Sequence, residues 1–583
     1  MSELIPKGLP KGKQVLEKGL KTSRSFEMGV SAFQRERGLT LSDWRRRNTG
    51  EGNVLFVAQM GLATVKEQVE SMKEMYDRCK ERGTDVGAMI VTSNWVNGLP
   101  RGDLRSKAPR GTSFTLDGPE DFVKVAQAAP IMPLFADNMV GTPNSVSNAV
   151  NALKAGAPGL GTMSQFTWNY PYWHDDVGQV AATVEALGIL AGKREQGAGI
   201  GSYMGDGTSA GFIDHASEVG YCLLEQYIVE KLCGARYMTG LGGLISHIPS
   251  KMATWLASHE VLSAALGTDD IVMVHVEGNT LEVSEDAHSN YGLVLADFLP
   301  YAILERKYKT GAFYSAKPIM EAVRVPTLTE IADVILACAA GLRKVPEFEE
   351  AKIFNEAEIN KLKRVLVVNG RKFFRNILKG LPGLGVDIKD PVELLLAVRR
   401  LGGAKLEQLY HPGERDPKKY RGIVPFAPTD LIMMQQMITD FTVDAIRQEK
   451  LGDSISGKKI VAGSTDTHEF GLYVLEGVLN AFGARVVHAG VDQDAEQILD
   501  VAHKEGTPYI AVSTHNGQCL EWGTNLVEES RRRRQPVTVF MGGVLNTIVD
   551  GVSEPVDVTD QLSALGIKTC EDINALFKQM TKV

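Results

Sequence analysis

The chain has 583 residues, of which 44% are hydrophobic and 23% charged, and its formal net charge is −8 at pH 7. This length exceeds one ordinary domain, so we expect two or three soluble domains with ample apolar core. The acidic balance excludes the basic field typical of nucleic-acid binders. No run approaches the ~18 apolar residues that a membrane span needs. We therefore expect a cytoplasmic protein that binds neither nucleic acid nor membrane.

The six cysteines are scattered, and no pair has the C-x-x-C spacing, so the sequence predicts neither a zinc site nor a disulfide framework. Residues 1–50 are polar and include Trp44-Arg45-Arg46-Arg47 near their end. We expect an N-terminal arm that packs on a neighbouring domain or subunit. The alternative is an anion site at Arg45–Arg47.

Residues 51–345 alternate short apolar runs with helical stretches. The apolar runs are 54–57, 87–91, 131–135, 271–275 and 312–314, and the clearest helical stretches are 64–82 and 145–155. This alternation predicts a parallel α/β architecture. The length favours a (β/α)8 TIM-like barrel with its active site at the carboxyl ends of the strands, and a doubly wound sheet is the alternative. Residues 346–455 show long helical periodicity, which indicates a helical extension and linker.

Loop signals follow several of the predicted strands of this region. They are 97–100, 141–145, 168–172, 240–243 and 317–321. Each one alone is typical of a turn. Histidines could serve as acids or bases in such a pocket, and the alternative for each is a structural role. The candidates are His174, His215, His247, His275 and His288.

Residues 456–583 have a clearer pattern. Strands are predicted at 459–464, 484–488, 509–512 and 537–540, with helices at 472–482 and 495–504 between them. In a doubly wound sheet, ligands bind beyond the carboxyl ends of the strands. His468 lies in the first such loop, two residues after Asp466. A metal-ligating imidazole usually donates its other N–H to a carboxylate. The alternative is that Asp466 caps the next helix and His468 is an ordinary loop histidine.

The motif Asp-x-His-x-x-Gly, at Asp466, His468 and Gly471, is followed by a loop at Ser513 and by Gly542-Gly543. Together these segments resemble the cobalamin-binding domain of the base-off/His-on class. The resemblance implies a Rossmann-like, flavodoxin-like fold over residues 456–583. It also implies His468 as the cobalt ligand and Asp466 as its partner. Ser513, Gly542 and Gly543 would line the nucleotide tail, and Gly471 would lie close to the corrin. Where that family often has Ser-x-Leu, this chain has Ser513-Thr514-His515.

The barrel region resembles the barrel subunit of glutamate mutase. The matching segments are Asn97-Gly98-Leu99-Pro100, Gly141-Thr142-Pro143-Asn144-Ser145, Trp168-Asn169-Tyr170-Pro171-Tyr172 and Lys317 to Glu321. The resemblance implies that Lys317 and Glu321 hydrogen-bond the adenosine ribose and that Tyr172 lies near the substrate. An exposed i,i+4 salt bridge is the alternative for Lys317 and Glu321. Arginines expected near Met60 and in 137–140 are absent.

Both resemblances together imply an adenosylcobalamin-dependent carbon-skeleton mutase, an isomerase that uses radical chemistry on a small carboxylic acid. Glutamate mutase and the single-chain 2-methyleneglutarate mutase illustrate the type, and we expect a homo-oligomer, a dimer or tetramer. A cobalamin-dependent methyltransferase is the main alternative. That class has a four-helix cap before its cobalamin domain, for which the helices at 430–450 are too few. A third alternative is a non-catalytic cobalamin sensor or carrier.

Overall fold

The computed structural model describes residues 4–108, 113–204, 211–266, 271–321, 323–417, 419–466, 468, 470–515, 517–547 and 555–582. Two compact units make up the chain. The barrel unit comprises Met1–Pro100, Thr112–Thr167 and Asp175–Asp430. The C-terminal unit comprises Arg101–Gly111, Trp168–His174 and Leu431–Val583.

Eight parallel strands form a closed barrel in the order β1 to β8. They are β1 (Leu55–Met60), β2 (Val86–Val91), β3 (Met132–Phe135), β4 (Gly159–Leu160), β5 (Gly199–Met204), β6 (Tyr237–Leu241), β7 (Met273–Glu277) and β8 (Phe313–Ser315). Pairing of Leu55 with Phe313 and of Val57 with Ser315 joins β1 to β8 and closes the ring. The predicted TIM-like barrel is confirmed.

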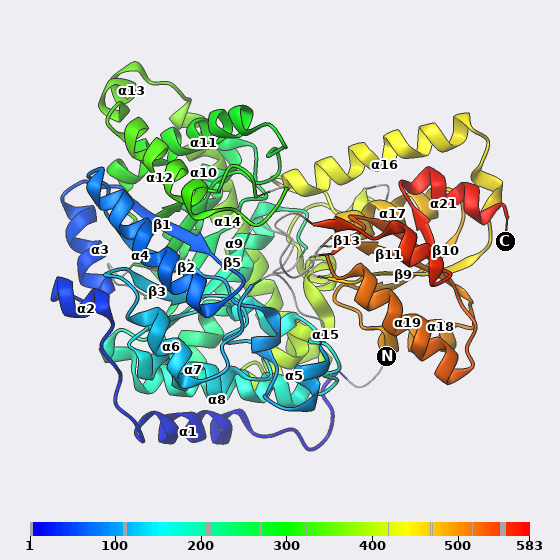
Figure 1. Ribbon diagram of the computed structural model, residues 1–583, viewed down its shortest axis with the longest axis horizontal. Helices are drawn as coiled ribbons and strands as arrows, with labels where there is room; N and C mark the ends of the chain where they lie inside the picture. The colour runs from blue at the N-terminus through cyan, green and yellow to red at the C-terminus, as the bar shows by residue number, and fades with distance from the viewer. Residues whose placement is uncertain are drawn as a thin grey trace. The chain divides into compact units, whose positions relative to one another are not determined.

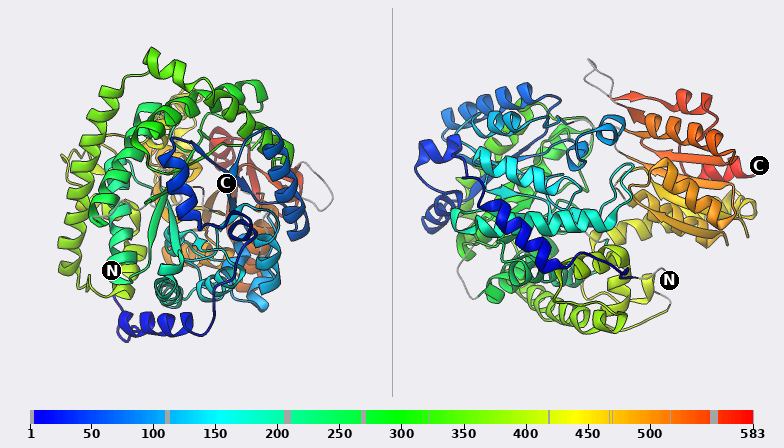
Figure 2. Two further views of the ribbon diagram at one scale, coloured as in Figure 1. Left: turned by 90° about the vertical axis from the view of Figure 1, so that its left-hand side faces the viewer. Right: turned by 90° about the horizontal axis from the view of Figure 1, so that it is seen from below.

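Helices surround these strands, as Figures 1 and 2 show. They are α4 (Val65–Glu81), α6 (Pro119–Ala126), α7 (Ser145–Ala155), α8 (Asp176–Gly192), α9 (His215–Gln226), α10 (Ile248–Leu266), α11 (Ala287–Tyr308) and α12 (Leu328–Leu342). Helix α4 shows how the sequence sets a boundary. Thr64 and Glu67 form a capping box at its start, and Met72 and Met75 bury its inner face.

The N-terminal arm forms α1 (Gly12–Ser23), α2 (Ala32–Arg37) and α3 (Leu41–Gly50). Arg45 of α3 is buried at the amino-terminal end of the barrel, where its guanidinium donates to the carbonyl oxygens of Gly311 and Met273. The left view of Figure 2 shows this segment, in dark blue, in front of the strands. Because Arg45 is used in this way, the alternative of an anion site that includes it is wrong.

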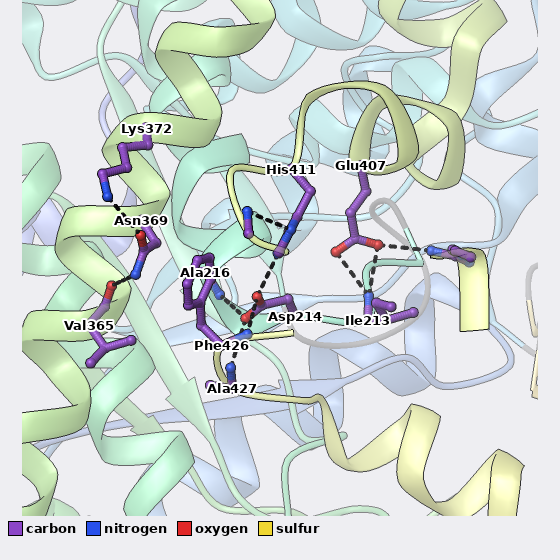
Figure 3. Close-up of polar contacts among 12 residues, drawn as sticks. Ile213, Asp214, Ala216, Val365, Asn369, Lys372, Glu407, His411, Phe426 and Ala427 are labelled. Carbon is purple, nitrogen blue, oxygen red and sulfur yellow. Dashed lines mark hydrogen bonds and ion pairs between the residues drawn. The ribbon is translucent and has the colours of Figure 1, made fainter. Parts of the chain in front are cut away.

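The extension after the barrel contains α13 (Val345–Ala351), α14 (Glu356–Gly380) and α15 (Pro391–Tyr410). Figure 3 shows the hydrogen bonds that join the end of α15 and the chain after it to the segment just before α9. Asp214 accepts hydrogen bonds from His411 Nε2 at 2.8 Å and from the backbone N–H groups of Phe426 and Ala427. Glu407 accepts from Ile213 N at 3.1 Å. These buried contacts make the extension a part of the barrel unit up to residue 430.

The C-terminal unit has a five-stranded parallel sheet in the order β10-β9-β11-β12-β15, which is flavodoxin-like. The strands are β9 (Lys459–Ser464), β10 (Arg485–Gly490), β11 (Tyr509–Thr514), β12 (Thr538–Gly543) and β15 (Lys568–Cys570), with a hairpin of β13 (Asn546–Thr547) and β14 (Val556–Asp557). The helices are α5 (Asp103–Lys107), α16 (Asp430–Gln448), α17 (Phe470–Ala481), α18 (Ala495–Glu505), α19 (Cys519–Arg533), α20 (Thr559–Ala564) and α21 (Ile573–Met580).

Two apolar clusters cover this sheet, one on each face. Val478 of α17 and Phe577 of α21 belong to one, and Ile498 of α18 and Leu526 of α19 belong to the other. Helices therefore pack on both faces of the sheet, as the predicted doubly wound fold requires. Among the described residues, no helix meets the length and hydropathy that a membrane crossing demands.

Strands β4, β5 and β6 gave no apolar run in the sequence. Strand β4 has two residues, β5 contains Gly199 and Gly201, and Gly240 lies in β6. The interpretation of 240–243 as a loop is wrong at Gly240 and Leu241, which are strand residues. The reason for Gly240 is space: a Cβ there would overlap the His275 ring on the neighbouring strand β7.

Candidate functional site

The first candidate site lies at the carboxyl end of β9 in the C-terminal unit. The Asp466 carboxylate is buried, and its Oδ1 accepts hydrogen bonds from His468 Nδ1 and His468 N, each at 2.9 Å. Burial alone would raise the pKa of Asp466, but the bonds and charge of His468 outweigh it and lower that pKa to about 2. The Asp466 carboxylate can only accept, so Nδ1 carries a proton, and in the neutral imidazole Nε2 then carries the lone pair that a metal ligand needs.

A second imidazole lies beside the first. The ring centroids of His468 and His515 are 4.4 Å apart with an interplanar angle of 46°. His515 N donates to Asp466 Oδ2 at 2.8 Å, so one carboxylate holds the loops after β9 and β11 together. Burial, together with the charge of His468, lowers the pKa of His515. The departure from Ser-x-Leu therefore puts a polar ring in contact with the predicted cobalt ligand.

An apolar cavity of about 200 Å³ opens at the same sheet edge. Ser513, Gly542 and Gly543 line it, as does Gly471 at the start of α17. The remaining lining residues are apolar except Asp572; they are Ile438, Phe470, Val474, Leu475, Val512, Phe540, Cys570, Ile573 and Leu576. All four residues assigned by resemblance to the tail and corrin are thus brought to one cavity.

Glycine is needed at two of these positions for definite reasons. Gly543 has φ +107°, and a Cβ there would overlap the carbonyl oxygen of Thr514. A Cβ at Gly471 would lie 2.5 Å from Ser513 Oγ. Larger residues at these positions would fill the cavity or displace its wall. The His468 nitrogen and the apolar cavity fit a cofactor that has an axial coordination position and a flat apolar tail.

The second candidate site lies at the carboxyl ends of the barrel strands. Lys317, just after β8, has a side chain that is only 5% exposed. Its Nζ lies 3.1 Å from Glu277 Oε1, donates to Gln59 Oε1 at 3.0 Å and lies 3.7 Å from Glu321 Oε1. Burial alone would raise the pKa of Glu277, but Lys317, His275 and the Tyr203 hydroxyl together outweigh it and hold that pKa below its ordinary value. The alternative of an exposed surface pair is wrong for Lys317.

Two ring side chains complete this centre. Tyr203 OH of β5 donates to Glu277 Oε2, and the Tyr203 and His275 rings lie 5.7 Å apart. His275 Nε2 is 3.7 Å from Glu277 Oε1. Burial lowers the pKa of His275 to about 4, so its imidazole is neutral at physiological pH.

Asp137 follows β3 and faces the same centre. Thr162 Oγ1 donates to its Oδ1 at 3.5 Å. Burial and then the Glu277 carboxylate raise the pKa of Asp137, Lys317 and the Thr162 hydroxyl oppose them, and the net pKa is about 6. The Glu321 side chain is 38% exposed, and its partial desolvation raises its pKa although Lys317 opposes this. The barrel centre thus combines a lysine with several carboxyl groups that differ in how readily they ionise.

Tyr172 lies elsewhere in the molecule. The structure groups it with the C-terminal unit, where its OH accepts a hydrogen bond from Asn525 Nδ2 at 3.1 Å and its N donates to Asp494 Oδ2 at 3.3 Å. Burial raises the pKa of its phenol. The structure brings Lys317 and Glu321 together in the barrel unit, but Tyr172 is not part of that cluster.

Sequence reasoning missed Gln59, Asp137, Tyr203 and Glu277. Gln59, Asp137 and Glu277 are polar residues in or just after apolar strands, and this position was the only signal that could have found them. Tyr203 lies in β5, which gave no apolar run, so the sequence held no signal for it. His275 was considered as an acid or base without a reason to prefer it. The reason is visible once strands β1, β3, β5, β7 and β8 close into a barrel and direct these residues to one end.

Comparisons with known proteins agree with the C-terminal site. The family model described as "B12 binding domain" matches residues 460–551. The chain therefore carries a B12-binding domain at the carboxyl-terminal end. The comparison with curated proteins found no match.

Two groups of solved structures are similar to parts of the chain. One is a cobalamin-binding protein from Desulfitobacterium hafniense DCB-2, with 17% identity and a TM-score of 0.20 over 26% of this chain and 69% of that one. The other is the carboxyl transferase domain of pyruvate carboxylase from Rhizobium etli, alone and with 3-bromopyruvate. These two have identities of 11% and 12% and TM-scores of 0.29 and 0.28, over 78% of this chain and 81% of theirs.

Proposed function

We propose that this protein is an adenosylcobalamin-dependent carbon-skeleton mutase that acts on a small carboxylic acid. One observation carries the proposal: a single chain joins a B12-binding domain to a closed eight-stranded barrel with a buried polar centre. A carrier or sensor needs no second centre of this kind. Bound adenosylcobalamin would supply a carbon radical through homolysis of its cobalt–carbon bond, and the protein's task is then to bind and orient.

In the C-terminal unit, His468 would offer Nε2 to the cobalt, and Asp466 would fix the ring in the required tautomer. Ser513, Gly542 and Gly543 would hold the nucleotide tail in the apolar cavity. The low pKa of Asp466 keeps this carboxylate ionised throughout the physiological pH range, so it can accept a hydrogen bond from His468 Nδ1.

In the barrel unit, Lys317 and Glu321 would bind the hydroxyl groups of the adenosine ribose. Lys317 is held in place by Glu277 and Gln59, which limits the rotamers of a long side chain before a ligand arrives. Such preorganisation reduces the entropy lost on binding. Tyr172 would contribute from its own loop near the substrate.

Cobalamin-dependent methyl transfer is the alternative. Between residue 430 and β9, the described part of the C-terminal unit contains one α-helix, α16, followed by a short 3-10 turn at Gly452–Ser454. A four-helix cap of the kind found before methyltransferase cobalamin domains does not fit this stretch. This observation favours the mutase.

The test is to load the purified protein with adenosylcobalamin without oxygen and add a panel of small carboxylic acids. The mutase proposal expects an EPR signal of Co(II) coupled to an organic radical with at least one acid, and an isomerised product by NMR. Methyl transfer from methylcobalamin to an acceptor, without any radical signal, would contradict it. Lys317→Met should abolish the radical signal while cobalamin still binds.

The proposal includes a homo-oligomer, a dimer or tetramer, and a cytoplasmic location. Size-exclusion chromatography with light scattering tests the first of these, and a monomer at all protein concentrations would contradict it.

A further inference from the structure

The charges at the carboxyl end of the barrel are unbalanced. Three carboxyl groups, Asp137, Glu277 and Glu321, face one ammonium, that of Lys317. Among the described residues, no other lysine or arginine lies within ion-pairing distance of these three. Lys251 donates to the backbone oxygen of Glu277, but its ammonium is paired with Asp297 at 2.7 Å, so that couple is neutral by itself.

Asp137 differs from the other two carboxyl groups, because no described residue forms an ion pair with it. Glu277 Oε1 lies 3.1 Å from Lys317 Nζ and Glu321 Oε1 lies 3.7 Å from the same nitrogen, whereas among the described residues Asp137 accepts a side-chain hydrogen bond from Thr162 Oγ1 at 3.5 Å. Asp137 is half-buried, and a partly desolvated carboxylate is more favourable when it protonates or meets a positive partner. The raised pKa of Asp137 is consistent with this situation.

A second, independent feature also indicates a ligand. His275 is 6% exposed, and neither of its ring nitrogens has a hydrogen-bond partner among the described residues. Buried polar atoms nearly always have partners in native proteins, so an orphaned imidazole calls for an explanation. Gly240 leaves the space that this ring occupies. The imidazole lies beside Glu277 and can donate from one nitrogen and accept on the other.

We propose that the barrel centre binds a substrate that carries a cationic nitrogen in place of a second carboxylate, with Asp137 receiving the ammonium and His275 hydrogen-bonding the same molecule. This inference rests on the proposed function, because it specifies which small carboxylic acid the mutase takes. A dicarboxylate would bring two further negative charges to a centre that already has an excess of them. An ammonium would form an ion pair with Asp137 and offset the free-energy cost of its partial desolvation.

The side chains around the centre agree with a cationic ligand. Met60 and Met139 occupy stretches next to the centre where an arginine could have held a carboxylate, and both are buried and apolar. Arg45 lies at the amino-terminal end of the barrel, where it donates hydrogen bonds to the carbonyl oxygens of Gly311 and Met273. The centre therefore offers acceptors, one occupied ammonium and a neutral imidazole.

Calorimetry on the full-length protein loaded with hydroxocobalamin tests this proposal without turnover. The probes are acids matched in chain length: ornithine, glutamate and glutarate, then 2,4-diaminobutanoate, aspartate and succinate, then lysine, 2-aminoadipate and adipate. In at least one series, the acid with the extra ammonium should bind about tenfold or more tightly than both dicarboxylates. The Asp137→Asn variant should lose this preference, because the amide keeps the shape and removes the charge.

Asp77→Asn, on the exposed surface of α4, is the matched control and should keep the preference. Dicarboxylates that bind equally well or better would overturn the inference, as would a preference that survives Asp137→Asn. Failure of all nine acids to bind would overturn it too. The visible spectrum of the same sample reports separately whether cobalamin is bound, so this outcome is distinguishable from failure of the cofactor part of the proposed function.

Discussion

The two candidate sites differ in how their residues are distributed along the chain. In the C-terminal unit, Asp466 and His468 are two residues apart and already form the hydrogen bond that the motif implies. In the barrel unit, Gln59, Asp137, Glu277 and Lys317 come from different strands and meet only when the barrel closes. A local site can be predicted from a short motif, whereas a site built by topology requires the fold.

The difference is also electrostatic. The Asp466 carboxylate accepts hydrogen bonds from His468 and His515 and has a lowered pKa, whereas Asp137 has no ion-pair partner among the described residues and a raised pKa. In the proposed function, cobalt completes the first site and a charged ligand completes the second.

His468→Ala should produce the largest loss. It removes the nitrogen proposed to ligate cobalt, and cobalamin affinity should fall by about 100-fold or more. Equilibrium dialysis measures the affinity. His503→Ala, on the exposed end of α18, should leave it unchanged. An unaltered cobalamin affinity of the His468→Ala variant would contradict the proposal that His468 ligates cobalt.

Lys317→Met should mainly affect the barrel unit. The substitution leaves Glu277 buried without its cation, and breaking a buried pair in this way costs about 3–5 kcal/mol of stability. Thermal unfolding measured by circular dichroism should show a lowered Tm. Cobalamin affinity should stay within error, because the proposed ligands are in the other unit; a parallel loss of affinity would contradict the division of roles.

Asp466→Asn should weaken cobalamin binding by about 10–100-fold, the usual effect of losing the partner of a ligating histidine. The amide can still bond to the backbone, so the fold should persist. The matched variant Asp560→Asn, on α20, should bind as the parent does. Equal affinity in both variants would mean that the His468 tautomer is fixed by something other than Asp466.

His515→Leu restores the residue that is common in the resembled family. We expect only a few-fold change in cobalamin affinity, because the ring of His515 supports His468 but its backbone N–H still reaches Asp466. The nitrogen splitting in the EPR spectrum of bound Co(II) should nevertheless broaden as the His468 ring gains freedom. An unchanged spectrum would show that ring contact has no positioning effect.

Asp137→Asn should give the smallest effect, an increase in Tm of about 2 °C at pH 8 in the absence of substrate. The folded pKa of about 6 exceeds the ordinary 3.8, so stability is lost as pH rises from 3.8 through about 6, and the amide avoids this loss. The gain should therefore be smaller at pH 5. A lower Tm at pH 8 would mean that Asp137 has a stabilising partner.

Much of the fold could be predicted from the sequence, and the reasons are local. Strand β9 and helices α7 and α18 follow from apolar runs and capping residues such as Asp494. Strands β5 and β6 were missed because glycines replace apolar side chains there, and Gly240 is glycine to make room for His275. That requirement lies in a neighbouring strand, so no pattern within β6 could have revealed it.

The candidate sites divide in the same way. The sequence indicated His468, Asp466 and the cavity residues because they share short motifs. It indicated Lys317 and Glu321 as a pair, but Lys317 is buried between Glu277 and Gln59, which are far away in sequence. Tyr172 was assigned to the substrate by resemblance, and the structure shows that it bonds to Asp494 and Asn525; its place near the substrate stays a prediction.

We propose that one imidazole, that of His468, ligates cobalt in a cobalamin-dependent mutase. The most direct measurement is the EPR spectrum of protein-bound Co(II) cobalamin, prepared from unlabelled protein and from protein with 15N-labelled histidine. We expect the nitrogen splitting to change with the 15N-histidine label in the parent protein and to disappear in the His468→Ala variant. A splitting that is insensitive to the histidine label would contradict it.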